Sequence, residues 1–217
     1  MELYDSEQEQ VDAIKKWWKE NGTTTIVGIV LGLGAVVGWT GWQEYQQRQA
    51  ESASTLFEDQ RVATRENDYE KSATLAAQLA EEHGSSTYAT LGALLMAKLA
   101  YDSGQLDDAR RQYQWVIEKS DNPGMVSTAR LRLAKLNLSA GDADGALTLL
   151  NNADPGTFAA SADEIKGDAY LVKGDAEQAR AAYERALNEG EPNATVRQRL
   201  QMKLDDLGHE NFSSKEG

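Results

Sequence analysis

The sequence predicts an all-α protein in which a single N-terminal transmembrane helix precedes an array of stacked α-hairpins, an α-solenoid. Two observations favour this fold class: residues 22–42 carry no charge, and a motif of Gly with Ala five positions later recurs downstream. A third observation is that the chain has no alternating or β-branched run of the kind that predicts strands.

The uncharged stretch is long enough to cross a bilayer. From Gly22 to Trp42 it has 21 residues, and at about 1.5 Å per residue a helix there reaches roughly 32 Å, close to the ~30 Å hydrocarbon thickness. A globular core helix would have a polar face, which this stretch lacks. A cleavable export signal would begin with a short basic region and end at a small-residue site, and neither is found. We therefore predict a transmembrane helix over 22–43 that remains as an anchor.

The flanks of the span predict its orientation and its depth. Lys15, Lys16 and Lys19 precede the span and only Arg48 follows it closely, so residues 1–21 are expected to form an amphipathic cytoplasmic segment on the lipid surface. The C-terminal domain would then lie in the periplasm of a Gram-negative cell. Tryptophans at both ends are expected at the membrane interfaces, with ordinary helix packing as the alternative. They are Trp17, Trp18, Trp39 and Trp42.

Glycines spaced four residues apart would let another helix approach the span closely. The pairs are Gly28 with Gly32 and Gly34 with Gly38. The alternative is that glycine is simply more frequent in membrane helices. Both interpretations stay open at this point.

Four downstream segments resemble one another. They are 68–80 (DYEKSATLAAQLA), 104–117 (GQLDDARRQYQWVI), 141–153 (GDADGALTLLNNA) and 174–187 (GDAEQARAAYERAL). Their starts lie 36, 37 and 33 residues apart, which is the period of stacked helical hairpins. The array is predicted over residues 44–207, with a capping helix at 193–207 and a disordered tail at 208–217.

The recurring residues have physical reasons. The glycines, where a first helix ends and the chain reverses in a left-handed conformation, are Gly104, Gly141 and Gly174. The alanines that let the helices of a hairpin pack closely are Ala109, Ala146 and Ala179. Asp142 and Asp175 are placed to cap second helices. Tyr113 and Tyr183 follow an alanine by one helical turn and are expected to fill the space between hairpins.

The segment KGDAYLVKGD (166–175) places a small residue, Ala, Tyr and Gly-Asp in the order found in tetratricopeptide repeats. Residues 55–190 resemble that family. The resemblance implies a concave surface, lined by the first helices, that holds a peptide or protein segment. By repeat position the expected lining residues are Met96, Arg130, Asn137, Lys166 and Tyr170.

Composition argues against nucleic-acid binding and catalysis. The chain has 22 Lys and Arg against 35 Asp and Glu and no cysteine, so it repels phosphate backbones and has no thiolate chemistry. His83 and His209 lie far apart and lack a third metal ligand. Adjacent acids point about 100° apart on a helix and are expected on solvated faces. These pairs are Glu81-Glu82, Asp107-Asp108, Asp163-Glu164 and Asp205-Asp206. We expect no catalytic residue, metal or cofactor.

The chain start ELYDSEQEQVDAIKKWWKENG (2–22), the span VGIVLGLGAVVGW (27–39) and the degenerate repeats after it resemble the YfgM family, the ancillary subunits of the bacterial SecYEG translocon. The resemblance implies a single-pass inner-membrane protein whose periplasmic array associates with the translocon. It also implies contact with the membrane-anchored periplasmic chaperone PpiD and with exported polypeptides that pass to periplasmic chaperones.

Two other functional hypotheses remain. A structural scaffold for another envelope complex would share this architecture but bind a different set of partners. An enzyme of unrecognised type would require turnover by the domain that follows the span.

Overall fold

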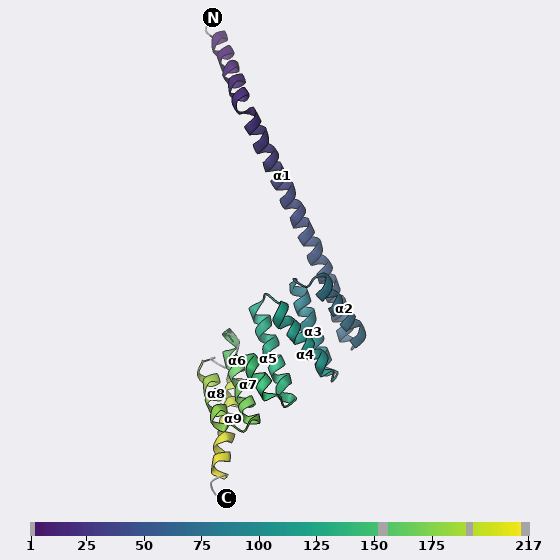
Figure 1. The fold of residues 1–217 in the computed structure, drawn as a ribbon, viewed down its shortest axis with the longest axis vertical. Helices are drawn as coiled ribbons and strands as arrows, with labels where there is room; N and C mark the ends of the chain where they lie inside the picture. Colours follow the sequence, from purple (N-terminus) through teal and green to yellow (C-terminus); the bar gives the residue numbers. More distant parts are fainter. Residues whose placement is uncertain (1–2, 152–155, 190–192, 214–217) are drawn as a thin grey trace. The chain divides into compact units, whose positions relative to one another are not determined.

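Every regular element that the structure describes is a helix, which confirms the predicted all-α class. The computed structural model describes residues 3–151, 156–189 and 193–213. The chain divides into two units, Met1–Ser52 and Ala53–Gly217. The long helix α1, Leu3–Arg65, forms the first unit and also supplies the first helix of the second (Figure 1).

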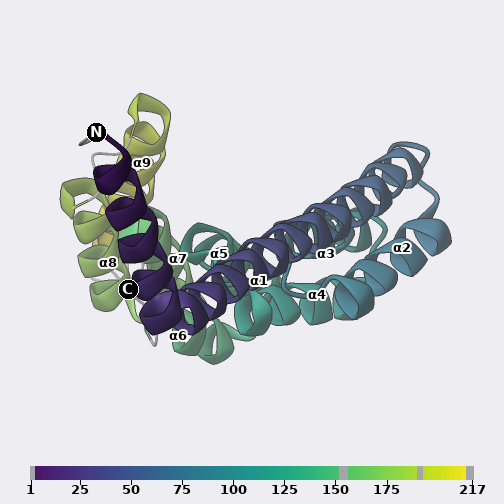
Figure 2. The same ribbon diagram turned by 90° about the horizontal axis from the view of Figure 1, so that it is seen from above.

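The second unit is a stack of helical hairpins. Its further elements are α2 (Tyr69–Glu82), α3 (Thr87–Asp102), α4 (Leu106–Lys119), α5 (Pro123–Ser139), α6 (Ala143–Asn151), the short 3-10 helix η1 (Gly156–Phe158), α7 (Ala159–Val172), α8 (Ala176–Glu189) and α9 (Ala194–Ser213). The end of α1 is joined to α2 by the turn at Asn67 and by a hydrogen bond between the Thr64 and Ser72 hydroxyls. Helices α3, α5 and α7 pack against α4, α6 and α8. In Figure 2, α3, α5 and α7 form the inner row of the stack and α2, α4, α6 and α8 the outer row.

Each hairpin reverses at a residue with positive φ, as the sequence predicts. The turns contain Gly104, Gly141 and Gly174, with φ between 75° and 82°. In the first hairpin Asn67 takes the equivalent place with φ 55°. Asn is, after Gly, among the residues that adopt this left-handed conformation most readily. The first hairpin therefore keeps the turn geometry of the others without a glycine.

Aspartate side chains cap three of the second helices. Asp142 Oδ1 accepts a hydrogen bond from the Gly145 backbone N–H at 2.8 Å, and Asp175 Oδ1 accepts one from Gln178 N–H at 3.0 Å. Asp68 caps α2 in the same manner. These bonds satisfy N–H groups that the helix itself leaves without a partner, which confirms the predicted caps.

The core lies between the two rows and is built from small residues. The motif alanines Ala109, Ala146 and Ala179 are fully buried. Tyr183 is also fully buried, and Tyr113 is 5% exposed. A Cβ added to Gly167 would lie 2.3 Å from the Tyr183 ring. Gly167 therefore provides the space that the Tyr183 ring occupies between α7 and α8.

The ends of several elements differ from the sequence-based boundaries or lie outside the described residues. Pro123 follows α4 and occupies the first turn of α5, where its missing N–H costs nothing. Pro155 and Pro192 fall outside the described residues. The capping helix α9 continues to Ser213, past its predicted end at residue 207. The last four residues of the predicted tail also lie outside that part of the chain.

Candidate membrane span and partner-binding face

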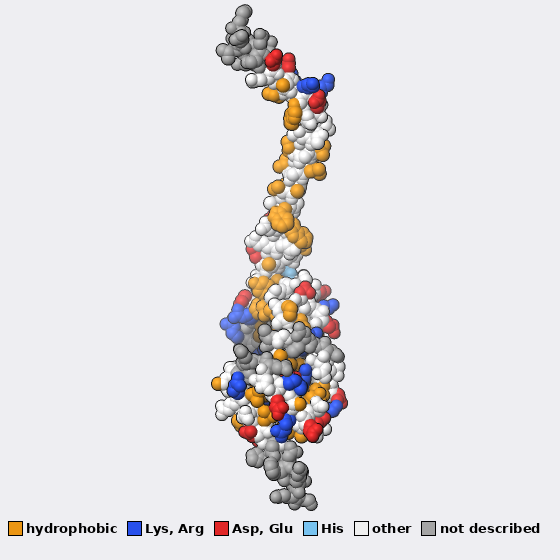
Figure 3. Space-filling view, turned by 90° about the vertical axis from the view of Figure 1, so that its left-hand side faces the viewer, with side chains coloured by type: hydrophobic (Ala, Val, Ile, Leu, Met, Phe, Trp, Pro, Cys, Tyr) orange, Lys and Arg blue, Asp and Glu red, His pale blue; other side chains and the backbone are white. Residues whose placement is uncertain are grey.

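The apolar part of α1 is almost entirely uncovered by the described residues of the chain. Eight aliphatic side chains in it are exposed by 51–69%: Ile26, Val27, Ile29, Val30, Leu31, Leu33, Val36 and Val37. Figure 3 shows this helix as hydrophobic and uncharged surface between its charged ends. A core helix would bury such side chains against other elements. The described residues contain one helix long and apolar enough to cross a membrane, and it includes the predicted span.

The four tryptophans lie at the two ends of this stretch and are exposed. Trp17 and Trp18 are each 52% exposed, and Trp39 and Trp42 are 69% and 58% exposed. The Trp18 ring covers Gly22, where an added Cβ would lie 3.2 Å from it. Amphipathic rings at these positions suit two headgroup levels, so their interfacial role stays a prediction.

The four glycines of the span are not required by packing within the chain. A Cβ added at Gly28, Gly32, Gly34 or Gly38 would meet no other described atom within 4 Å. Space at these positions is therefore available to a helix of another protein. Their role in helix packing remains a prediction.

Two of the five predicted groove residues belong to the core. Met96 is 2% exposed and packs in the core cluster formed by α2, α3, α4 and α5, and Asn137 is 8% exposed on α5. Burial to this extent leaves their side chains unavailable to a partner. We therefore remove them from the candidate face.

The other three predicted residues are partly accessible. Lys166 Nζ lies 3.5 Å from Asp163 Oδ1, and its side chain is 17% exposed. Tyr170 packs partly buried against the last two hairpins. Arg130 lines a cavity of about 490 Å³ beside the α4–α5 turn, together with Ile117, Val126 and Phe158. Of the five, only Arg130 lines this cavity, and the predicted residues do not converge on one groove.

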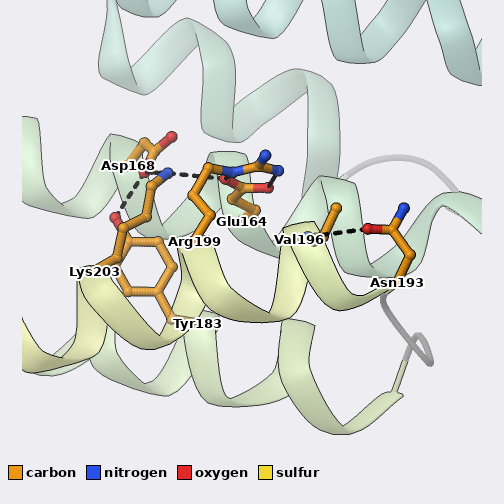
Figure 4. Close-up of polar contacts among 7 residues, drawn as sticks. All are labelled: Glu164, Asp168, Tyr183, Asn193, Val196, Arg199 and Lys203. Carbon is orange, nitrogen blue, oxygen red and sulfur yellow. Dashed lines mark hydrogen bonds and ion pairs between the residues drawn. The ribbon is translucent and has the colours of Figure 1, made fainter.

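A network of ion pairs between α7 and α9 is the feature that sequence reasoning missed (Figure 4). Glu164 accepts two hydrogen bonds from Arg199, at 2.6 and 2.7 Å. Lys203 Nζ lies 3.0 Å from Glu164 and 2.6 Å from Asp168. The Tyr183 hydroxyl donates to Asp168 at 2.7 Å. The network fixes the capping helix to the last hairpin.

The environment of Glu164 keeps it ionised. Burial would raise the pKa of this carboxyl, but hydrogen bonds from Arg199 and Lys203 and their positive charges lower it to about 2. Burial and the Asp168 carboxylate raise the pKa of the Tyr183 hydroxyl. The expectation that Asp163-Glu164 is a solvated acidic pair is wrong, since the two residues are 6% and 8% exposed. Cations from α8 and α9 reach them across the stack.

This arrangement offers binding surfaces. Glu164 is held ionised by Arg199 and Lys203, so it is not poised as a general acid or base. Within the ranges that the structure describes, no three His, Cys, Asp or Glu side chains form a group that could hold a metal ion. The fold and its surfaces thus define a repeat protein with one candidate membrane helix, and the sequence model for tetratricopeptide repeat-like domains matches residues 15–209.

Known proteins resemble the chain over nearly its whole length. An ancillary SecYEG translocon subunit of Escherichia coli is 32% identical over 95% of this chain and 99% of its own. The subunits of that name from Haemophilus influenzae and Neisseria gonorrhoeae are 29% and 27% identical, each over 93% of this chain and 97% of its own. The chain belongs to the tetratricopeptide repeat-like family of ancillary SecYEG translocon subunits, a non-catalytic family.

Proposed function

We propose that this protein is an ancillary subunit of the SecYEG translocon that crosses the inner membrane once and works through contacts of its repeat domain. The observation that carries the proposal is the similarity to translocon subunits, which extends over 95% of this chain and includes the apolar helix as well as the repeats. A relative that shared only the repeats would support a binding domain without a membrane assignment.

The proposed orientation places the N-terminus in the cytoplasm and the array in the periplasm. Three lysines, Lys15, Lys16 and Lys19, precede the span, whereas Arg48 follows it and pairs with Glu44 at 2.9 Å. Positive charge is retained on the cytoplasmic side during insertion. An alkaline phosphatase fused after residue 207 should be active in intact cells. Activity only of a phosphatase fused to the N-terminus would reverse the topology.

The proposed task of the array is to receive exported polypeptides and pass them to periplasmic chaperones, with PpiD as a partner. The resemblance to the YfgM family suggests this task, and a stack of hairpins supports it because its inner row forms an extended binding surface. The exposed glycines of α1 are the proposed contacts with translocon helices.

Site-specific crosslinking in native membranes tests the translocon contact. A photo-crosslinker at Gly28 or Gly32 should capture a SecYEG subunit, because these two positions share one helix face. The matched control is Val30, which has the same depth but lies on the opposite face at about 100° per residue. Capture of subunits of another envelope complex would favour the scaffold function. Equal capture from Val30 would remove the glycine face from the proposal.

A further inference from the structure

Three cations occupy the same position in successive hairpins. Arg61, Lys98 and Lys135 lie 37 residues apart, on α1, α3 and α5. Each stands six residues before the turn residue of its hairpin, which is Asn67, Gly104 or Gly141. Equivalent positions of stacked hairpins line up along the stack. The three side chains therefore form a row across the first helices, which we call the cation row.

Apolar side chains accompany each cation on the same helix face. Phe57, Leu94 and Leu131 precede the three cations by four residues, and residues four apart share a helix face. All three pack partly buried against the core, which leaves part of each ring or side chain accessible. Tyr101, three residues after Lys98, is 50% exposed. The face thus alternates positive and apolar surface.

The cations of the row are available to an external carboxylate. The Lys98 side chain is 63% exposed and pairs with Asp102, and that of Arg61 is 46% exposed and pairs with Glu58. Ion pairs between exposed side chains of one helix stabilise only weakly, so a partner can replace them. Lys135 is exposed and forms no ion pair with a carboxylate of the described residues.

The fourth hairpin shows how this face binds a charged segment. The position equivalent to the row is Asp168, six residues before Gly174, and Glu164 lies one turn earlier. There the signs are reversed, and Arg199 and Lys203 of α9 bind the two acids. The chain therefore covers this face of α7 with its own oppositely charged helix, α9. The equivalent faces of α1, α3 and α5 keep their cations exposed.

We infer that the cation row binds an extended segment of a partner polypeptide in which acidic residues alternate with apolar ones. Carboxylates would pair with Arg61, Lys98 and Lys135. Apolar side chains of the segment would lie on Phe57, Leu94 and Leu131. Charge selects such a segment for this face, because residues from Glu44 on carry 19 Lys and Arg against 29 Asp and Glu and repel acidic chains elsewhere. The inference rests on the proposed function and specifies the chemistry of the polypeptide bound.

Peptide binding to the full chain in mild detergent tests the inference. The probes are a fluorescein-labelled peptide in which Asp alternates with Leu, Ala and Ser, and a second peptide with Lys in place of every Asp. Fluorescence anisotropy at about 0.15 M salt should give tighter binding of the acidic peptide, weakening as salt rises. Equal affinity for the two peptides would overturn the inference.

The double variant Lys98→Glu/Lys135→Glu locates the site. It should weaken the acidic peptide at least about fivefold and strengthen the Lys peptide relative to the natural chain. The matched control is Lys71→Glu/Lys119→Glu on α2 and α4, which changes the net charge equally from exposed positions of the outer row. An equal loss in this control would overturn the inference.

Two further measurements separate the possible failures. Circular dichroism should show unchanged helix content in both double variants, because all four lysines are exposed, and Lys98→Gln/Lys135→Gln serves if charge reversal unfolds the chain. Co-purification of the natural chain with SecYEG tests the proposed function separately. If the natural chain co-purifies with SecYEG but shows no preference for the acidic peptide, only the inference about the cation row is rejected. If the natural chain does not co-purify with SecYEG, the translocon assignment is rejected, and peptide binding still decides the inference about the cation row.

Discussion

At the scale of single residues, close packing between helices depends on positions where a side chain is absent or small. Gly167 is the clearest case, because the fully buried Tyr183 ring occupies the place of its missing Cβ. The ring cannot move away at low cost, since its hydroxyl is held by Asp168. The missing side chain of Gly167 therefore allows α7 and α8 to approach closely.

Gly167→Ala should destabilise the array by about 1–3 kcal/mol, the usual cost of inserting a methyl group into a filled core. Urea unfolding of the full chain in detergent, followed by circular dichroism, measures this. Ser161→Ala is a control on the same helix, because Ser161 is exposed. A Gly167→Ala chain as stable as the natural one would mean that Tyr183 has another place to go.

The turn glycines act through the backbone. Gly141→Ala places a Cβ on a residue with φ 82° and should cost about 1–2 kcal/mol. Beyond the adjacent residues, no described atom lies within 4 Å of the added Cβ, so the cost is conformational and does not come from a clash with other elements. Asn67→Gly is the complementary change and should alter the free energy of unfolding by less than about 0.5 kcal/mol. Equal effects of the two substitutions would contradict this account.

At the scale of elements, α9 is held by apolar contacts and by charge. Leu200 and Leu207 are buried against α8, while Arg199 and Lys203 bind Glu164. Because the folded-state pKa of Glu164, about 2, lies below the ordinary value of 4.5, its stabilisation is complete above pH 4.5. It is lost as the pH falls toward 2.

Lowering the pH from 5 to about 2.5 should therefore release α9 before the rest of the stack, at a cost of about 2 kcal/mol from Glu164. Hydrogen exchange of the α9 amides measures the release. Glu164→Gln removes the ionisable group, so α9 in this variant should exchange faster at pH 7 and respond less to acid. An unchanged response to acid in Glu164→Gln would assign the effect to other carboxylates.

The sequence predicts the elements well because their signals are local. Gly141 at the turn and Asp142 at the helix cap are adjacent in sequence. The same pattern recurs in other repeats, which supports the assignment of each turn. The α7–α9 network could not be predicted in this manner, since Glu164 and Arg199 are 35 residues apart and belong to no periodic pattern. The prediction that Met96 lines a binding groove is wrong for a related reason. Periodicity shows that a helix has a buried face, but the packing of the neighbouring helices decides which residues belong to that face.

At the scale of the whole molecule, the two units differ in how much apolar surface they expose. The repeat unit buries most of its core residues within its own stack, whereas the eight aliphatic side chains between Ile26 and Val37 are each more than half exposed. Exposure of so many contiguous apolar side chains is unfavourable in water. A bilayer removes this cost without any protein partner, which is the physical reason for treating α1 as an anchor.

A charge placed in the middle of the exposed apolar stretch tests this anchor directly. Eight aliphatics contribute about −0.3 to −0.6 kcal/mol each to insertion, and one central Lys costs about 2.5–3.5 kcal/mol. Leu31→Lys, at a side chain 68% exposed, should therefore bring insertion close to balance and release much of the protein from membranes washed with carbonate. Gln46→Lys adds the same charge beyond the span and should leave the protein in the membrane fraction. If both variants remain equally bound, the apolar stretch of α1 is not what anchors the chain.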